Sequence, residues 1–168
     1  MFYWKHFDLD PKEVEKIQKR FKWFLPKNNH FFQQLNIGLK DFMGLEVQRF
    51  VLIQVAPGAI GRIHTDFRPE GYGDKLALQI PLEHCEHSVT HIWESNYVPP
   101  TQYTDNGQPY NYFDPEKCTH ITSFRLTRPT FFRTDLPHSV DNLSNNVRKA
   151  ISIRFKEDPW HLIGEQGE

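Results

Sequence analysis

Beyond residue 44 the sequence consists of short β-type segments separated by the turn-forming residues Pro, Gly, Asn and Asp. This alternation of strands and turns restricts the possible folds more than any other feature of the sequence. Closely spaced segments of this kind are typical of β-sandwiches and barrels. Strands are predicted at residues 46–56, 61–67, 75–82, 88–94, 120–126, 130–134, 138–141 and 148–155. Two packed sheets of about eight short strands make a jelly roll. The expected fold class is therefore mainly β, a double-stranded β-helix of the cupin-like type.

The N-terminal segment has helical character. Asp10 is placed as an N-cap, Pro11 at the first helical position and Glu13 in the first turn. Apolar residues then recur at helical spacing up to Pro26, namely Val14, Ile17, Phe21 and Phe24. A weaker helical periodicity over residues 30–43 ends at Gly44. We expect one domain over 1–168, with a helical buttress at 1–44, a jelly-roll core at 45–156 and a tail at 157–168.

Composition narrows the classes of partner. The 20 Lys and Arg residues against 21 Asp and Glu residues give a net charge of −1, so the basic excess of a dedicated nucleic-acid-binding domain is missing and no nucleic-acid partner is expected. No apolar run approaches the roughly 20 residues of a membrane helix, and the N-terminus lacks the apolar centre of a signal peptide. A cytoplasmic protein without a membrane partner is expected, with Cys85 and Cys118 as free thiols. The oligomeric state stays open.

The segment 95–119 fits no strand. It is rich in Pro, Tyr, Asn and Asp and is too long for an ordinary hairpin loop. Two interpretations remain open for it. It forms a wall or lid of a binding site, as long loops often do, or it is a surface excursion packed by its own tyrosines.

The sharpest functional pattern is His64-Thr65-Asp66 together with His138. Residues two apart on a strand point to the same side, so His64 and Asp66 can present an imidazole and a carboxylate to one point. His138 begins a later predicted strand and can supply a third ligand. Two histidines and one carboxylate make a facial triad that suits Fe(II) and leaves coordination positions open. The alternative is a solvated surface strand that carries both residues for solubility.

The predicted strand 148–155 alternates cleanly. Ile151, Ile153 and Phe155 share one face, whereas Arg148 and Arg154 lie on the other. If the polar face points into the barrel, an arginine there requires an anionic partner. A dicarboxylic cosubstrate bound through bidentate guanidinium contacts would provide one. An edge strand with ordinary surface arginines is the alternative.

The sequence contains an HxD pair, His64 and Asp66, which is followed much later by His138. Arg148 comes ten residues after His138. This order resembles the Fe(II)/2-oxoglutarate-dependent dioxygenases, and the strings LALQIPL and PHSVDNLSNNVRKAISIRF look like those of small bacterial and phage members and of the aspartyl/asparaginyl and prolyl hydroxylase branches. The resemblance covers roughly residues 46–155. It implies that the first three residues bind iron, that Arg148 holds the distal carboxylate of 2-oxoglutarate, and that O2 is the oxidant.

The chain departs from these branches at two points. Aspartyl/asparaginyl hydroxylases of the best-known type lack the acidic ligand and carry extra basic groups on the next strand, whereas this chain has Asp66 followed by Ala77 and Gln79. Some small-molecule oxidases of the superfamily carry Arg-x-Ser on the last strand, where this chain has Ala150. The substrate therefore stays open between an amino-acid or peptide side chain and a small metabolite.

Further residues complete the predicted site. Gln79 is expected beside the cofactor, and Trp93 and Arg62 are expected to contact the substrate, although a strand-face glutamine, a core tryptophan and a rim arginine are alternatives. Another possible metal site is the tract of His84, Cys85, Glu86 and His87, which lacks a partner set at zinc-finger spacing apart from Cys118 and His120.

The protein is predicted to be an Fe(II)- and 2-oxoglutarate-dependent oxygenase. Its expected reaction is hydroxylation of an amino-acid or peptide side chain or of a small metabolite. Two other functions remain open. One is a cupin-type metalloenzyme that uses the metal without 2-oxoglutarate, which has no need of Arg148. The other is a metal-free binding module on the same barrel.

Overall fold

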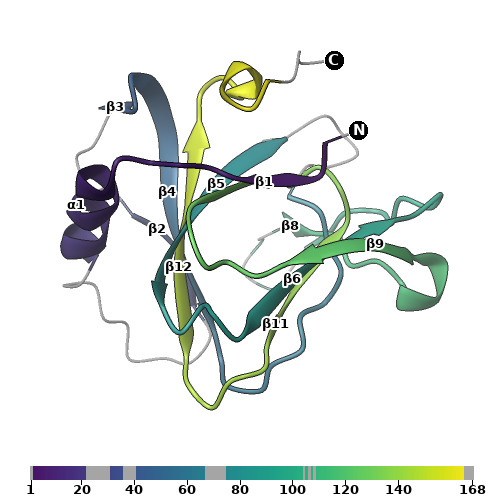
Figure 1. Ribbon diagram of the computed structural model, residues 1–168. Helices are drawn as coiled ribbons and strands as arrows, with labels where there is room; N and C mark the ends of the chain where they lie inside the picture. Colours follow the sequence, from purple (N-terminus) through teal and green to yellow (C-terminus); the bar gives the residue numbers. More distant parts are fainter. Residues whose placement is uncertain are drawn as a thin grey trace.

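The computed structural model describes residues 2–21, 31–35, 41–66, 75–103, 105, 107 and 109–164, with the backbone alone at 31–35 and 41. Within these residues the protein is mainly β, with one α-helix and two short 3-10 turns (Figure 1). The elements are β1 Trp4–His6, α1 Pro11–Phe21, β2 Phe31–Leu35, β3 Asp41–Phe42, β4 Leu45–Val55, β5 Leu76–Glu83, β6 Ser88–Glu94, β7 Gln102–Tyr103, β8 Pro109–Tyr110, η1 Pro115–Lys117, β9 Thr119–Phe124, β10 Thr130–Arg133, β11 His138–Asn142, β12 Arg148–Phe155 and η2 Trp160–Leu162.

The strands form two main antiparallel sheets. The large sheet has the order β1-β10-β5-β12-β4-β2, with β3 paired to β4, and the small sheet has the order β11-β6-β9. β7 and β8 pair separately as a two-stranded ribbon. In Figure 1, α1 lies against the large sheet on the side away from the small sheet.

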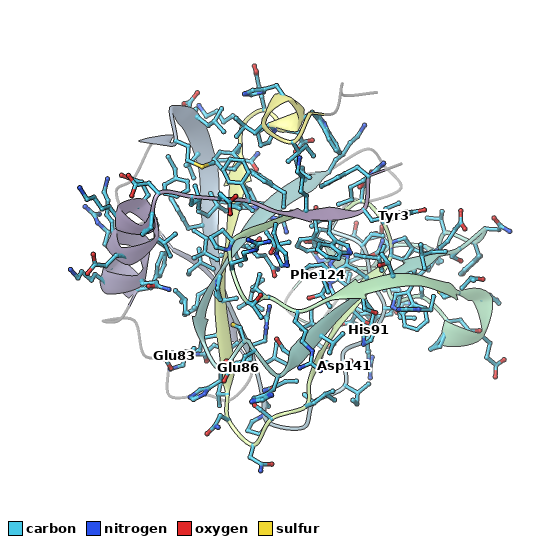
Figure 2. All side chains as sticks on the ribbon, in the orientation of Figure 1. Tyr3, Glu83, Glu86, His91, Phe124 and Asp141 are labelled. Atoms are coloured by element: carbon cyan, nitrogen blue, oxygen red, sulfur yellow. The ribbon has the colours of Figure 1, made fainter. Side chains whose placement is uncertain are left out.

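The alternation of β12 divides the core into two layers. Ile151 and Ile153 pack on the outer side of the large sheet with Ile17 and Phe21 of α1. Ala150, on the other face of β12, packs between the sheets in a second cluster of buried apolar residues, which consists of Ala77, Cys85, Ile92, Phe124, Leu126, Phe132 and Ala150. Figure 2 labels Phe124 of this cluster. The predicted two-faced character of residues 148–155 is confirmed, and Arg148, Ser152 and Arg154 are buried between the sheets.

The helix at the N-terminus begins as predicted. Asp10 accepts a hydrogen bond from the backbone N–H of Lys12 through Oδ1 at 2.9 Å, and its carbonyl accepts from the N–H of Glu13 at 2.9 Å. These contacts satisfy backbone donors that the first turn leaves unpaired. Phe24 and Pro26 lie outside the described residues. In the part of the chain that the structure describes, no helix is both long enough and apolar enough to span a membrane.

The prediction of a second helix at residues 30–43 is wrong. Residues 31–35 form β2, which pairs with β4 from Phe31 opposite Gln54 to Leu35 opposite Phe50. Residues 41–42 form β3, and Met43 and Gly44 connect it to β4 with φ values of 58° and 75°. Two consecutive positive φ values are those of a type I′ hairpin turn, so Gly44 closes a hairpin rather than a helix. Pairing along the edge of the large sheet outweighs the weak helical periodicity.

Most strands beyond residue 44 agree with the predicted ranges. β6 and β12 match at both ends, and β4, β5, β9, β10 and β11 match within a residue or two. Residues 61–66 differ, because they form no ladder and only His64 makes isolated bridges, to Tyr112 and to His138. The segment 95–119 contains the β7-β8 ribbon and η1, and the tail contains η2.

Candidate metal centre

His64 and His138 are joined through their backbones. The N–H of His64 donates to the carbonyl of His138 at 2.9 Å, and the N–H of His138 donates to the carbonyl of His64 at 2.8 Å. This reciprocal pair sets the two residues directly opposite each other, as in an antiparallel ladder. Their rings lie 4.5 Å apart between centroids. The segment 61–66 therefore carries one histidine to the beginning of β11, where the other stands.

The ring nitrogens of both histidines have defined roles. The Nδ1 of His64 lies 2.9 Å from the carbonyl oxygen of Arg62, and the Nδ1 of His138 lies 2.9 Å from that of Leu136. Because a carbonyl only accepts, each Nδ1 carries the proton and donates it. Each Nε2 therefore keeps a lone pair, which is the state that a metal ligand requires.

Both free nitrogens face Asp66. The Nε2 of His64 lies 3.8 Å from its Oδ1, and the Nε2 of His138 lies 4.0 Å from its Oδ2. The ligand atoms of the three residues all lie within 4.8 Å of one another, and no other such group of three occurs in the described part of the chain. The structure thus brings together the three residues that the sequence pattern selected. Two imidazole nitrogens and one carboxylate suit a first-row divalent ion.

Asp66 is held by an arginine whose role the sequence left open. Arg154 donates from Nη2 to Oδ2 of Asp66 at 2.5 Å and from Nη1 to Oγ1 of Thr134 at 2.7 Å. The backbone of Asp66 is fixed as well, because its N–H donates to the Thr134 carbonyl at 2.8 Å. The carboxylate is therefore oriented independently of any ion.

The charges around Asp66 and His138 determine their protonation. Burial opposes ionisation of Asp66, but Arg154 and the two histidines outweigh it and hold the pKa of the carboxyl well below its usual range. Burial, reinforced by the nearby His64, lowers the pKa of His138 from 6.5 to about 4, although Asp66 acts in the opposite direction. At neutral pH the site is therefore a carboxylate beside a neutral imidazole, ready to accept a cation without losing a proton.

Arg148 lies between the sheets on the same face of β12 as Arg154, and it is 0% exposed. Its Nε donates to Oγ of Ser88 at 3.0 Å and its Nη2 donates to Oε1 of Gln79 at 3.3 Å. Its Nη1 has no hydrogen-bond partner, and none of the carboxylates that the structure describes pairs with it. Burial lowers the pKa of its guanidinium. The structure therefore brings Gln79 and Arg148 together around an uncompensated cation.

The hydroxyl of Ser152 is a second buried group without a partner. Ser152 lies on the same face of β12 and is registered with Gln79 of β5. The Arg148 guanidinium reaches Gln79, so it leans along β12 toward Ser152 and toward the end that carries Arg154. Two unpaired donors thus face the same space between the sheets, which favours an acceptor there.

The long segment 95–119 borders the metal centre. Asn111, which is 2% exposed, donates from Nδ2 to Oγ1 of Thr65 at 2.6 Å. The N–H of Phe113 donates to the carbonyl of Ile63 at 2.9 Å. Tyr112 pairs with His64 through an isolated bridge, and the Arg62 guanidinium lies 5.0 Å above the Tyr112 ring. Arg62 thus stands at the rim of the site, stacked on a residue of the loop.

Trp93 is not brought to the metal centre. On β6 its neighbour Ile92 faces the space between the sheets, whereas Trp93 points to the opposite side and donates from Nε1 to Oγ of Ser139 at 3.1 Å. Its ring contacts those of His91 and His120. Its predicted contact with substrate remains a prediction without support from this position.

The zinc alternative does not assemble among the described residues. Cys85 is buried between the sheets and its thiol donates to the carbonyl of Lys149 at 3.0 Å, whereas His84, Glu86 and His87 are exposed. Burial raises the pKa of the Cys85 thiol although Arg148 opposes this, so the thiol stays protonated. A protonated thiol is a poor metal ligand.

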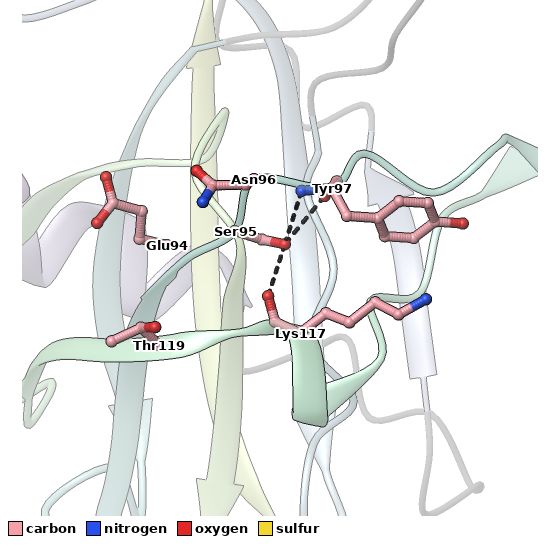
Figure 3. A pocket seen from close by; sticks show the side chains of 6 residues that line it. All are labelled: Glu94, Ser95, Asn96, Tyr97, Lys117 and Thr119. Atoms are coloured by element: carbon pink, nitrogen blue, oxygen red, sulfur yellow. Dashed lines mark hydrogen bonds between the residues drawn. The ribbon is translucent and has the colours of Figure 1, made fainter.

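A separate pocket of about 300 Å³ lies at the beginning of the long segment (Figure 3). In it, the Ser95 hydroxyl donates to the carbonyl of Lys117 at 2.9 Å, and the Lys117 ammonium lies 4.6 Å from the Tyr97 ring centre. Its lining residues are Glu94, Ser95, Asn96, Tyr97, Lys117 and Thr119. None of them is a residue of the metal centre.

Comparison with solved structures gives the fold. The chain is similar to the non-heme alpha ketoglutarate dependent carbocyclase SnoK from nogalamycin biosynthesis, with 14% identity, a TM-score of 0.54, and coverage of 92% of this chain and 79% of SnoK. It is also matched to AviO1 from Streptomyces viridochromogenes Tue57, with 13% identity, a TM-score of 0.49, and coverage of 94% and 90%. An oxalate decarboxylase matches 79% of this chain at 13% identity and a TM-score of 0.38, and the chain spans 27% of its length.

The likeness to SnoK shows that the two proteins share a mainly β fold. No protein-family model matches the sequence. No curated protein matches it either.

Several contacts of the site were missed from the sequence. Thr134 lies twenty residues before Arg154, and Asn111 lies within a loop without periodicity, so neither carries a local signal. Arg154 could have been suspected, because it shares a strand face with Arg148. Its distance along the strand argued against a common ligand, and the structure gives each arginine a different partner.

Proposed function

We propose that the protein is an Fe(II)- and 2-oxoglutarate-dependent oxygenase built on a double-stranded β-helix. The substrate is an amino-acid or peptide side chain or a small metabolite, and hydroxylation is the reaction. His64, Asp66 and His138 would hold the metal, since their donor atoms converge and two imidazoles with one carboxylate suit Fe(II). The fold likeness to SnoK, named as an alpha ketoglutarate dependent enzyme, is compatible with this proposal.

The proposal rests mainly on one observation, that Arg148 is fully buried and has no anionic partner within the described ranges of the chain. A guanidinium buried between sheets without an anionic partner is costly, and natural proteins retain such a group when a ligand completes it. Its unpartnered Nη1 and the unpartnered hydroxyl of Ser152 lie on one strand face. The distal carboxylate of 2-oxoglutarate would accept from the guanidinium, with Gln79 fixing its orientation.

Iron with 2-oxoglutarate and O2 would supply the oxidation of an unactivated C–H bond. The residues of the chain would orient the metal ligands and the substrate. The carbonyls of Arg62 and Leu136 keep the Nε2 lone pairs of His64 and His138 available. Arg154 fixes the Asp66 carboxylate. Arg62 and Tyr112, stacked at the rim, would contact the substrate and orient it.

The test is an anaerobic titration of 2-oxoglutarate into the Fe(II)-loaded protein, followed by the metal-to-ligand absorption band. Truncating one partner of a buried charge pair costs roughly 2 to 5 kcal/mol, so Arg148→Met should weaken 2-oxoglutarate binding by about thirtyfold to several thousandfold. Fe(II) affinity should not change, because Arg148 is not a ligand. Asp66→Asn should weaken Fe(II) binding itself.

Arg125→Met serves as the matched control, because Arg125 is exposed and its guanidinium donates to the backbone carbonyl of Glu86, away from the metal centre. Iron binding without an effect of 2-oxoglutarate would favour a cupin-type metalloenzyme that does not use this cosubstrate. Failure to bind any divalent ion would indicate that the protein is a metal-free binding module. Either result contradicts the proposal.

A further inference from the structure

The small sheet carries a second group of reactive side chains on the face opposite the metal centre. In the register of β11 and β6, His138 pairs with Ile92, which is buried between the sheets, whereas Ser139 pairs with His91 on the other face. Ser123 of β9 also pairs with His91. Cross-strand partners share a face, so His91, Ser123 and Ser139 stand together on the outside of the small sheet.

His91 lies between a carboxylate and a hydroxyl. Its Nε2 is 3.3 Å from Oδ2 of Asp141, and its Nδ1 is 2.8 Å from Oγ of Ser123. Figure 2 labels His91 and Asp141 on neighbouring strands of the small sheet. The other oxygen of Asp141 accepts from the N–H of Gly61 at 3.0 Å, and a Cβ at Gly61 would lie 2.5 Å from the Val140 carbonyl. That close approach anchors the carboxylate beside the imidazole.

A second imidazole faces the same hydroxyl. The Nε2 of His120 lies 2.7 Å from Oγ of Ser123. One proton arrangement satisfies all of these contacts. His91 carries its proton on Nε2, toward the Asp141 carboxylate, and its Nδ1 accepts from the Ser123 hydroxyl. The Ser123 oxygen then accepts from the Nε2–H of His120.

We propose that Ser123 is a nucleophile that takes acyl groups from carboxylic esters, with His91 as its general base and Asp141 as the residue that positions His91. The order of contacts, carboxylate, imidazole and hydroxyl, is that of the Ser-His-Asp triads found on unrelated folds, with Nδ1 of His91 in the place that Nε2 takes in those triads. His120 adds an N–H donor at the reacting oxygen. In the proposed reaction this N–H would turn from Oγ to the oxyanion that forms on the adjoining carbon.

The reaction balances without a metal or a redox partner. The Ser123 oxygen attacks the ester carbonyl while its proton passes to Nδ1 of His91. The bond between the acyl carbon and the alkoxide breaks, and His91 returns the proton to the leaving alcohol. Water then attacks the acyl-serine ester, gives a proton to His91, and releases the carboxylic acid as Ser123 recovers its proton.

The position is open to a small ester. β9 is an edge strand of the small sheet, and the His91 and Asp141 side chains are 23% and 19% exposed. The pocket of Figure 3 lies beyond this group on the same two strands. It includes Glu94 and Thr119, the cross-strand pair next to that of Trp93 and His120.

A fluorophosphonate probe tests the proposal, with p-nitrophenyl acetate as the substrate for rate measurements. The whole protein is treated with the probe in the presence of EDTA, and the adduct is located by mass spectrometry. We expect one adduct on Ser123, formed equally well without metal. His91→Gln should slow acyl transfer by about a hundredfold or more, and His120→Ala by about a hundredfold.

Ser139→Ala is the matched control, since Ser139 lies on the same face but its hydroxyl is contacted by the Trp93 indole and not by a base. It should keep the full labelling rate, whereas Ser123→Ala should lose the adduct. Circular dichroism of His91→Gln shows whether this variant is folded, so that a slower rate can be assigned to the missing imidazole. An unlabelled parent protein, an adduct on another serine, or a rate that His91→Gln leaves unchanged would each overturn the proposal.

Discussion

The Nη2 of Arg154 lies 2.5 Å from Oδ2 of Asp66, although the two residues are 88 positions apart in the chain. This pair gives the candidate metal centre its fixed carboxylate. Arg154 is 4% exposed, and the same guanidinium also holds Thr134. The arginine therefore occupies one oxygen of the carboxylate and leaves the other, Oδ1, to face His64.

Arg154→Met should destabilise the metal-free protein by about 2 to 4 kcal/mol, because removal of one partner leaves the other as an uncompensated charge. Added Mn²⁺ should recover part of that loss, since a bound cation neutralises Asp66. Urea denaturation with and without Mn²⁺ measures both effects. An apo stability equal to that of the parent would show that solvent already compensates Asp66.

Arg148→Met should have the opposite effect on the metal-free protein. Methionine replaces a buried charge without an acidic partner, so the free energy of unfolding should rise by about 1 to 3 kcal/mol. The parent should in turn be stabilised by 2-oxoglutarate in the presence of Mn²⁺, and the variant should not. Thermal midpoints at several 2-oxoglutarate concentrations provide the comparison. A less stable apo variant would indicate that Ser88 and Gln79 already satisfy the guanidinium.

The lowered pKa of His138 predicts a stability that depends on pH. Burial lowers its pKa from 6.5 to about 4, so between these values the unfolded chain binds more protons than the folded one. Stability therefore falls as the pH decreases through this window, by up to about 3 kcal/mol for a shift of this size. Unfolding in EDTA at intervals from pH 7.5 to 4.5 measures the slope. His138→Asn should be flatter than the parent, and an unchanged slope would assign the effect to other groups.

Asn111→Ala should loosen the long segment from the metal centre. The Asn111 amide is buried and donates to Thr65, which lies between His64 and Asp66. Loss of this contact should cost about 1 to 3 kcal/mol and weaken Mn²⁺ binding, because the segment that carries two ligands gains freedom. Ser95→Ala, in the same segment but at the separate pocket, provides the control. Equal Mn²⁺ affinity in Asn111→Ala and the parent would contradict the expected coupling.

Sequence periodicity predicted the strands whose two faces meet different surroundings. Residues 148–155 are an example, since Ile151 faces α1 and Arg148 faces the interior. It did not predict residues 31–35, because their strand state depends on pairing with Gln54 and its neighbours on β4. Tertiary pairing of this kind has no local signal.

The same distinction applies to the site. The spacing of His64 and Asp66 is local, and the structure places them together with His138. The contact between Arg154 and Asp66 depends on where segment 61–66 crosses the end of β12, which no spacing within either segment reports. The orphaned Nη1 of Arg148 likewise follows only from the packing of both sheets.

The reciprocal backbone bonds between His64 and His138 have a thermodynamic consequence. They assemble the two imidazoles during folding, so the conformational entropy lost in gathering the donors belongs to folding and not to metal uptake. An ion that binds there would find imidazole rings already ordered by their Nδ1 hydrogen bonds, unlike the ion of a zinc finger, whose binding drives the chain to fold. Exchange of an ion at the candidate metal centre would therefore be governed by the ion's own hydration and by access past the rim, and global unfolding would keep the cooperativity of the metal-free protein.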